Sequence, residues 1–260
     1  MDRIISSLLE LEEQYGIKIL YAVEAGSRAW GYASEHSDYD VRFIYVHPVR
    51  HYLSLQTKRD VIEKKVDYQL ELAGWDLKKA LSLLHRSNPS ILEWLTEENI
   101  YLKHDSIKKI RDLSKHSFSA YKVLKHYVRM AKKNLNLMDE PYTQVKDYIH
   151  IIRPFLSSLW LLKLRTFPPN QIAAIMKELN LGESLRREIE HILHLKIQGK
   201  EQMDSQYFSH SVKKIKQDLG EIETHISGFV DNVGDIEEFN DVFLHILEEI
   251  WGRKRGRLTD

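Results

Sequence analysis

The strongest constraint on the fold of this 260-residue chain is where its strand-like segments lie, because they are confined to the first third. Short apolar, β-prone stretches occupy residues 17–23 and 39–46. From about residue 104 to 250 the apolar residues instead recur at helical spacing. We therefore expect a sheet-bearing α/β unit over residues 1–103, followed by an all-α helical domain over residues 104–260.

The remaining elements are predicted from the same periodicities. Val61 and Ile62 belong to a short third strand, and residues 66–72 alternate between apolar and polar side chains as a further strand. Helices, separated by Pro and Gly breaks, are expected over residues 3–15, 77–86, 90–95, 104–115, 117–137, 143–165, 169–180, 183–197, 206–229 and 235–251.

Composition narrows the classes of function. The 38 Lys and Arg residues balance 38 Asp and Glu residues, so no overall basic excess indicates nucleic-acid binding. The basic run 253–257 is typical of a solvated tail. The absence of Cys excludes disulfides, thiolate catalysis and Cys-ligated zinc. The acidic start of the chain does not resemble a signal peptide, and no apolar stretch approaches the ~20 residues of a membrane span. We expect a cytoplasmic protein that does not enter the membrane.

Two aspartates carry the first chemical signal. Asp38 and Asp40 lie two residues apart at the start of the predicted strand 39–46. Side chains at positions i and i+2 of a strand share a face, about 7 Å apart at the backbone. Carboxylates this close repel each other unless they are protonated or bind a metal, and oxygen-only ligands suit Mg²⁺ or Mn²⁺. A third carboxylate on a neighbouring strand would complete a two-metal site for phosphoryl transfer, and Glu71 is the candidate.

A Gly-Ser pair carries the second signal. Gly26 lets backbone N–H groups approach a phosphate closely, and a helix beginning at Ser27 would direct its N-terminus at that anion. The Ser27 hydroxyl and the Arg28 guanidinium add donors. Carboxylate-bound metals beside an anion site predict a nucleoside triphosphate site. The expected reaction is in-line attack on the α-phosphorus, with pyrophosphate leaving.

These motifs together resemble a known signature. Gly26-Ser27, ten intervening residues and then Asp38-Tyr39-Asp40-Val41 resemble the DNA polymerase β-type nucleotidyltransferases. A longer match over about residues 20–165 resembles one branch, the predicted nucleotidyltransferases associated with RNA ligase in RNA-repair gene clusters. That match rests on residues 25–31, 37–45, 74–81, 87–95, 131–134 and 153–154 and on Trp160.

The resemblance implies a fold and a set of roles. The fold would be α+β, a small mixed sheet with flanking helices followed by a helical partner domain. Gly26 and Ser27 would bind the triphosphate, and Asp38 and Asp40 would hold the metals. Glu71 takes the third carboxylate position, which is usually Asp in this branch, and the alternative is Asp67. The favoured acceptor is an RNA 3′ end, with a protein side chain or a small molecule also open. Asp40 or Glu71 would act as the general base.

Several nearby residues admit two readings. Arg42 follows Asp40 on the same strand face and either neutralises the aspartates or contacts a phosphate. Lys146, His150 and Arg153 recur at i, i+4 and i+7, and either line the nucleotide site or form a solvated helix face.

The aromatic and histidine residues are also open to two readings. Trp30 either stacks on a base or packs in the core, and Trp75 and Trp94 are expected in the core. His191 and His194 are spaced to bind a metal but are more typical of a surface pair.

A different class of function shares the same motifs. A non-catalytic module that binds a nucleotide or a protein partner, such as the antitoxin-like half of a pair, could have this sequence. Transfer of label from a nucleotide separates that module from an enzyme.

Overall fold

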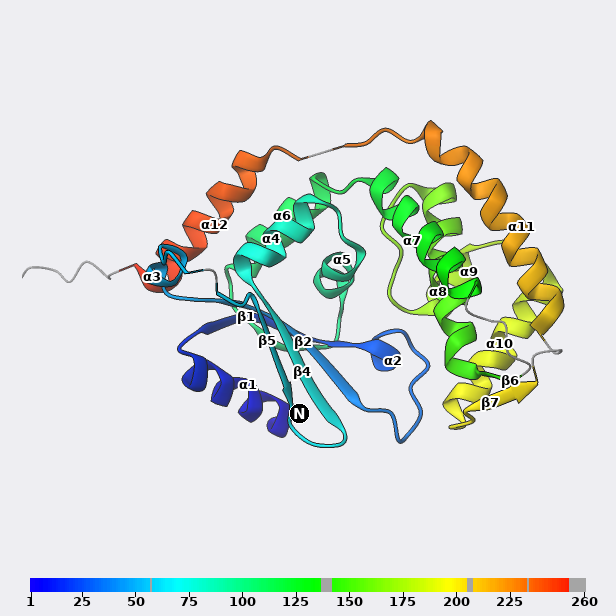
Figure 1. Cartoon of the computed structure of the whole chain (residues 1–260), viewed down its shortest axis with the longest axis horizontal. Helices are drawn as coiled ribbons and strands as arrows, with labels where there is room; N and C mark the ends of the chain where they lie inside the picture. Colours follow the sequence, from blue (N-terminus) through cyan, green and yellow to red (C-terminus); the bar gives the residue numbers. More distant parts are fainter. Residues whose placement is uncertain (57, 137–141, 205–207, 233, 253–260) are drawn as a thin grey trace, which may run out of the picture. The chain divides into compact units, whose positions relative to one another are not determined.

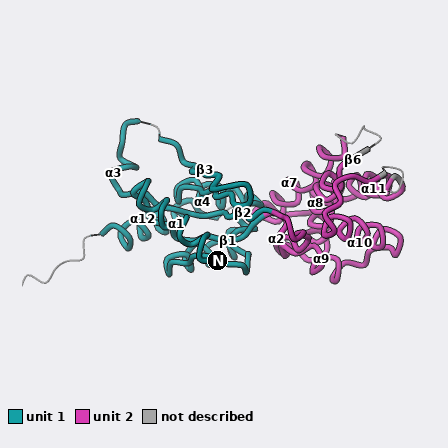
Figure 2. The backbone as a smooth tube through the Cα atoms, turned by 90° about the horizontal axis from the view of Figure 1, so that it is seen from below, with its two compact units in different colours: residues 1–25, 38–118, 233–260 teal, residues 26–37, 119–232 magenta. Residues whose placement is uncertain are grey.

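The computed structural model describes residues 1–56, 58–136, 142–204, 208–232 and 234–252 (Figure 1). Contacts divide the chain into two compact units (Figure 2). Unit 1 comprises residues 1–25, 38–118 and 233–260, and unit 2 comprises residues 26–37 and 119–232. These units are discontinuous in sequence and do not follow the predicted division at residue 103, which stays a prediction about domains.

Unit 1 is built on a five-stranded mixed sheet in the order β3-β4-β2-β1-β5. Strands β2 and β4 are parallel, and the other neighbouring pairs are antiparallel. The strands are β1 (Lys18–Ala25), β2 (Tyr39–Val46), β3 (Val61–Lys65), β4 (Leu70–Asp76) and β5 (Ile100–Lys103). The mixed sheet and the helical residues that follow it confirm the expected α+β fold.

One face of the sheet packs against α1 (Asp2–Tyr15). The helix contributes Ile4, Leu8 and Leu11, which recur at helical spacing and pack with the alternate residues Val41 and Phe43 of β2. The intervening residues of β2 therefore point to the opposite face. Figure 1 shows α1 on one side of the sheet and α4 on the other.

The prediction for residues 66–72 is wrong in its first half. Residues 66–69 form the turn of the β3–β4 hairpin, and the strand begins at Leu70. The Asp67 carboxylate accepts the Gln69 N–H at 2.7 Å, and the Val66 N–H donates to the Leu70 carbonyl at 2.9 Å. Hydrogen bonding from Asp to the backbone two residues on is typical of turns, and here it overrides the alternating pattern.

The other face of the sheet is covered by helices of unit 1. Helices α4 and α5 contact strands of the sheet, and α12 packs on α4 and α6. Trp75 and Trp94 stack with ring centroids 3.9 Å apart, and Trp94 is buried, in agreement with the expected packing role. Besides α1, the helices of unit 1 are α3 (Val49–Tyr52), α4 (Leu77–His85), α5 (Pro89–Thr96), α6 (Ile107–His116) and α12 (Ile236–Trp251).

Unit 2 is helical apart from a two-stranded sheet, so the prediction that residues 104–260 are all-α is wrong at these two short strands, which form by pairing with each other. Helices α7 and α8 pack along each other, and α10 and α11 pack on α8. Its elements are α2 (Gly26–Ala29), α7 (Ala120–Leu135), β6 (Tyr142–Gln144), α8 (Val145–Leu164), α9 (Ile172–Glu178), α10 (Glu183–Ile197), β7 (Gln202–Asp204), α11 (Ser209–His225) and the 3₁₀ turn η2 (Ile226–Gly228). Within the described ranges, none of the helices is both long and apolar enough to cross a membrane.

Candidate active site

Two of the predicted carboxylates lie side by side in unit 1. Asp40 and Glu71 are register partners on the parallel strands β2 and β4. Val41, Leu70 and Leu72 belong to the core formed with α1, so the alternating residues Asp40 and Glu71 occupy the opposite face. The sequence-predicted pair is therefore brought to one place on the sheet.

Arg42 lies on the same face and bridges these two carboxylates. Its Nη1 is 3.1 Å from Glu71 Oε1 and its Nη2 is 3.5 Å from Asp40 Oδ1. Arg42 is 24% exposed and Glu71 is 52% exposed, so the contact between Arg42 and Glu71 is open to water and is worth little by itself. These contacts agree with the first of the two interpretations of Arg42, in which its charge neutralises the carboxylates.

The other two acidic candidates are placed differently. Asp38 lies immediately before β2 and is exposed. Asp67 lies in the β3–β4 turn, where its carboxylate pairs with Arg3 and accepts the Gln69 N–H. Asp67 is therefore already engaged by neighbours of its own, whereas Glu71 faces Asp40.

A divalent metal is implied by the signature, and the donor set can be tested against it. All three candidates are carboxylates, the oxygen donors that Mg²⁺ and Mn²⁺ prefer, and two of them already share one cationic group, the Arg42 guanidinium. The donor atoms of Asp38, Asp40 and Glu71 are therefore of the kind that binds such an ion. In the part of the chain that the structure describes, however, no three His, Cys, Asp or Glu side chains form a group that could hold a metal. The metal role of Asp38, Asp40 and Glu71 thus stays a prediction.

Sequence reasoning overlooked Glu24, which is 3% exposed at the end of β1. Its Oε1 accepts the backbone N–H of Asp40 at 3.0 Å, and Tyr101 donates its hydroxyl to Oε2. The available signal was an acidic residue inside an otherwise apolar strand, two positions before Gly26. A buried carboxyl is unfavourable unless it is hydrogen-bonded, so such a residue indicates a specific partner.

The phosphate-binding candidates Gly26, Ser27 and Arg28 form α2 and belong to unit 2. Gly26 has a φ of 60°, a left-handed conformation that residues with a Cβ rarely adopt. The expected helix is present but has only four residues, so its dipole supplies little field for an anion. The Arg28 guanidinium donates to the Ser37 carbonyl at 2.7 Å, which closes the segment between them.

Trp30 is covered on its ring by a cation of unit 2. The Arg153 guanidinium lies 3.9 Å from the ring centroid of Trp30, within the range of a cation–π contact. The Trp30 carbonyl accepts the Ile172 N–H at 3.2 Å, so the segment is fixed to α9 through its backbone as well. These contacts agree with the interpretation that Trp30 packs within the protein.

Lys146, His150 and Arg153 lie on α8, where the helix spacing places them along one face. His150 is half-buried, and its backbone carbonyl accepts the Asn134 side-chain N–H at 2.7 Å. Burial, together with the positive charges of Lys146 and Arg153, lowers the pKa of His150 below its ordinary value. The imidazole is therefore neutral near pH 7 and offers hydrogen bonds rather than charge.

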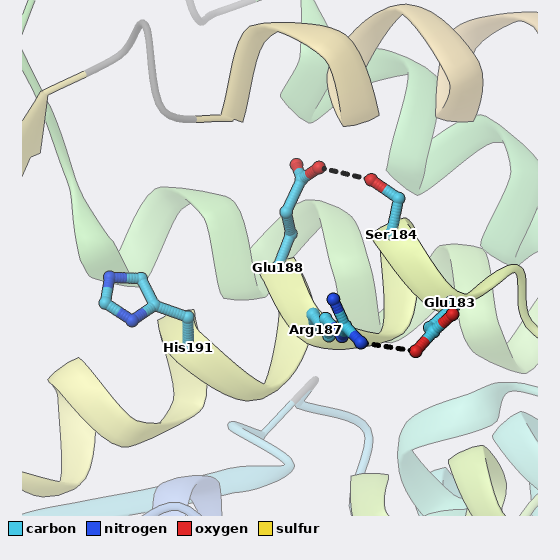
Figure 3. A pocket seen from close by; sticks show the side chains of 5 residues that line it. All are labelled: Glu183, Ser184, Arg187, Glu188 and His191. Carbon is cyan, nitrogen blue, oxygen red and sulfur yellow. Dashed lines mark hydrogen bonds and ion pairs between the residues drawn. The ribbon is translucent and has the colours of Figure 1, made fainter.

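A surface pocket of about 480 Å³ lies along α10, away from these candidates in the sequence (Figure 3). Its polar side chains pair with one another: Arg187 with Glu183, and Ser184 with Glu188 at 3.1 Å. His191 lines the pocket, whereas the ring of His194 contacts the Gln198 side chain at 2.8 Å. None of the predicted site residues lines this pocket.

The sheet and the carboxylate pair agree with the expectations drawn from the sequence. The sheet is mixed, and Asp40 and Glu71 lie beside each other on two of its neighbouring strands, as expected for a polymerase β-type nucleotidyltransferase. Residues 1–245 match the RlaP family, described as an RNA repair pathway DNA polymerase beta family, and the chain belongs to this family.

The known proteins similar to the chain include a curated relative and a solved structure. The uncharacterized protein YcgL of Bacillus subtilis (strain 168) is 34% identical over 258 residues, which cover 96% of this chain and 97% of that protein. A solved structure of a nucleotidyltransferase-like protein from Exiguobacterium sibiricum is 10% identical, covering 95% of this chain and 80% of the other, with a TM-score of 0.34.

Proposed function

We propose that the protein is a metal-dependent nucleotidyltransferase that moves a nucleoside monophosphate from a nucleoside triphosphate to an acceptor hydroxyl, an RNA 3′ end. The observation that carries this proposal is the register pairing of Asp40 with Glu71 on parallel strands, with Arg42 between their carboxylates. Family membership supports the reaction class. The choice of RNA rests on the description of the family.

In this proposal the carboxylates of unit 1 have two roles. Asp38, Asp40 and Glu71 hold Mg²⁺ or Mn²⁺, which when bound would neutralise the charge that develops on the phosphate oxygens. The acceptor oxygen forms a bond to the α-phosphorus as the bond to the bridging α–β oxygen breaks, and pyrophosphate leaves. The acceptor proton passes to the carboxylate of Asp40 or Glu71.

The basic and polar candidates bind the nucleotide. The backbone of Gly26 and the hydroxyl of Ser27 donate to the triphosphate, and Arg28 pairs with a phosphate oxygen. Arg42 is close enough to the carboxylates to contact a phosphate held beside them.

The third group of proposed nucleotide contacts lies on α8. Lys146 and Arg153 carry positive charge towards the nucleotide, whereas a neutral His150 contributes hydrogen bonds.

The test is transfer of label from each of the α-labelled nucleoside triphosphates, with Mg²⁺, to separate pools of RNA, protein and small molecules. We expect labelled RNA and loss of label with Asp38→Ala/Asp40→Ala. Asp60→Ala is the matched control, because Asp60 is exposed in unit 1 and pairs with Lys79 at 2.9 Å. RNA whose 3′ hydroxyl is blocked should stay unlabelled.

Two results would overturn parts of the proposal. Equal labelling by the Asp38→Ala/Asp40→Ala variant would remove the catalytic assignment. Nucleotide binding without transfer to any pool would favour the non-catalytic module.

A further inference from the structure

Glu24 is a buried carboxyl group near the end of a strand whose other buried residues are hydrophobic. Residues 19–23 of β1 are apolar and fully buried, and Glu24 follows them at 3% exposure. Burying a carboxyl is unfavourable unless donors replace the lost water. The donors around Glu24 therefore indicate what its side chain does.

Three donors converge on the Glu24 carboxylate. Oε1 accepts the backbone N–H of Asp40 at 3.0 Å and that of Ala25 at 3.3 Å, and the Tyr101 hydroxyl donates to Oε2. On the other side of β2, the Tyr39 N–H donates to the Gln69 carbonyl at 2.7 Å. Successive N–H groups of a strand point to opposite neighbours, so the Asp40 N–H faces β1, where Glu24 receives it.

Tyr101 fixes the orientation of this carboxylate. The pairing of β5 with β1 shifts register between Ala22 and Val23, and Tyr101 is the extra residue of β5 at that shift. A bulge of this kind redirects a side chain out of the regular alternation. Here the redirected Tyr101 hydroxyl reaches Glu24.

The position of Glu24 in the chain gives this bonding a consequence. The chain leaves unit 1 after Ala25 and returns to it at Asp38. Glu24 binds the backbone at the point of departure, through Ala25, and just after the point of return, through Asp40. The Glu24 side chain therefore accepts hydrogen bonds from the backbone of unit 1 on both sides of the 26–37 segment.

We propose that Glu24 is a positioning residue: by holding the Asp40 N–H it sets the backbone from which the Asp40 carboxylate reaches the metal site beside Glu71. This inference rests on the proposed function insofar as Asp40 binds metal. Partners that orient metal ligands typically change metal affinity or activity by about 10–100-fold when they are removed.

The test compares Glu24→Asp, which keeps the carboxyl group but shortens its reach by one C–C bond of about 1.5 Å, with Glu24→Gln, whose amide oxygen still accepts the N–H groups. Glu12→Asp is the matched control. Glu12 is half-buried in unit 1, and its Oε1 accepts the backbone N–H of Ile19 at 2.6 Å, at the other end of β1 from Glu24.

Two measurements are made on the full-length chain. The first is hydrogen exchange of the Asp40 amide without metal, which needs no assumption about the reaction. The second is the dissociation constant for Mn²⁺, the probe ion. We expect Glu24→Asp to speed exchange at Asp40 by roughly 10-fold and to weaken Mn²⁺ binding by about 10–100-fold. Glu24→Gln should stay within about 3-fold of wild type in both, and Glu12→Asp should change neither.

Unchanged exchange at Asp40 in Glu24→Asp would overturn the inference, and so would faster exchange with unchanged Mn²⁺ affinity. Values for Glu24→Gln that differ from wild type as much as those of Glu24→Asp would also overturn it, because keeping the hydrogen-bond acceptor in place would then not keep Asp40 in place. If the wild-type chain neither binds Mn²⁺ nor transfers nucleotide, the proposed function fails, and the exchange measurement alone decides whether Glu24 holds Asp40.

Discussion

At the scale of single residues, Glu71 and Asp67 differ in what their carboxylates already contact. Glu71 shares Arg42 with Asp40, whereas Asp67 is held by Arg3 and by the backbone of its own turn. Both carboxylates therefore have a cationic partner, but only that of Glu71 is shared with Asp40. Because Glu71 is the register partner of Asp40 and Asp67 is not, we propose Glu71 for the third carboxylate position.

We predict that Glu71→Gln weakens Mn²⁺ binding by at least about 10-fold, since one charged oxygen ligand is lost, while Asp67→Asn stays within about 2-fold of wild type. Titration of Mn²⁺ into each variant measures both values. If Asp67→Asn weakens binding as much as Glu71→Gln does, the turn residue is the ligand.

Single residues also show how far the sequence could be read. Period-two alternation predicts which side chains of a strand share a face. The carboxylates of Asp40 and Glu71, which this pattern singled out, do lie on one face of the sheet. Glu24 could not be assigned in the same way. Its partners are backbone N–H groups and Tyr101, which lies 77 residues away in a bulge that no local pattern predicts.

At the scale of elements, Gly74 allows β4 to pass close to Phe43. The two are register partners on β4 and β2, and a Cβ at position 74 would lie 2.1 Å from the Phe43 ring. We predict that Gly74→Ala lowers the free energy of unfolding by about 2–4 kcal/mol through overpacking. Gly220→Ala, in open space within α11, should raise it by up to about 1 kcal/mol. Urea denaturation measures both, and equal effects would contradict the close contact.

Asp76 caps α4, and the ionisation of its carboxyl group makes the stability of the folded protein depend on pH. Its carboxylate accepts the Lys78 N–H at 2.8 Å and the Tyr52 hydroxyl at 2.7 Å. Burial raises the pKa of Asp76 to about 6, despite these hydrogen bonds. The folded protein therefore binds a proton more tightly than the unfolded chain, and stability falls as pH rises from about 4 to about 6.

We predict that Asp76→Asn removes this slope, because an amide does not titrate. The unfolding free energy of the variant minus that of wild type should increase by up to about 3 kcal/mol between about pH 4 and pH 7. Denaturation at several pH values across this range measures the difference. A difference independent of pH would contradict the raised pKa.

Among the elements, β2 could be predicted to the residue, whereas β4 could not. The apolar run of β2 has no competing turn signal, but the alternation of residues 66–69 continues into β4 and hides a hairpin turn closed by Asp67. Strand β5 was missed because its four residues are too short for a pattern and depend on pairing with β1.

At the scale of the whole molecule, unit 1 is completed by α12, far along the chain from the sheet. Phe239 of α12 is 3% exposed and meets the His85 ring edge-on at 5.0 Å, and Phe243 meets Tyr52 in the same way at 5.1 Å. A division into an N-terminal and a C-terminal half was the natural reading of the sequence. Periodicity identifies helices but does not say which distant surface they cover.

We predict that Phe239→Ala destabilises unit 1 by about 3–5 kcal/mol, as expected for a buried Phe, and speeds hydrogen exchange in α4 and α6. Leu244→Ala, at a position of α12 that is 56% exposed, should change the unfolding free energy by no more than about 0.5 kcal/mol. Faster exchange confined to α12 itself would show that the helix is not part of the cooperative unit.

The late position of α12 also has a consequence during protein synthesis. All of the residues of unit 2 have been made before the ribosome reaches residue 236, whereas the sheet of unit 1, most of which is made earlier, still lacks α12. The nascent chain therefore exposes the surface of α4 and α6 that α12 later covers. Until α12 has been made, that apolar surface is open to chaperones and to aggregation, so unit 1 can complete its folding only after all of unit 2 has been made.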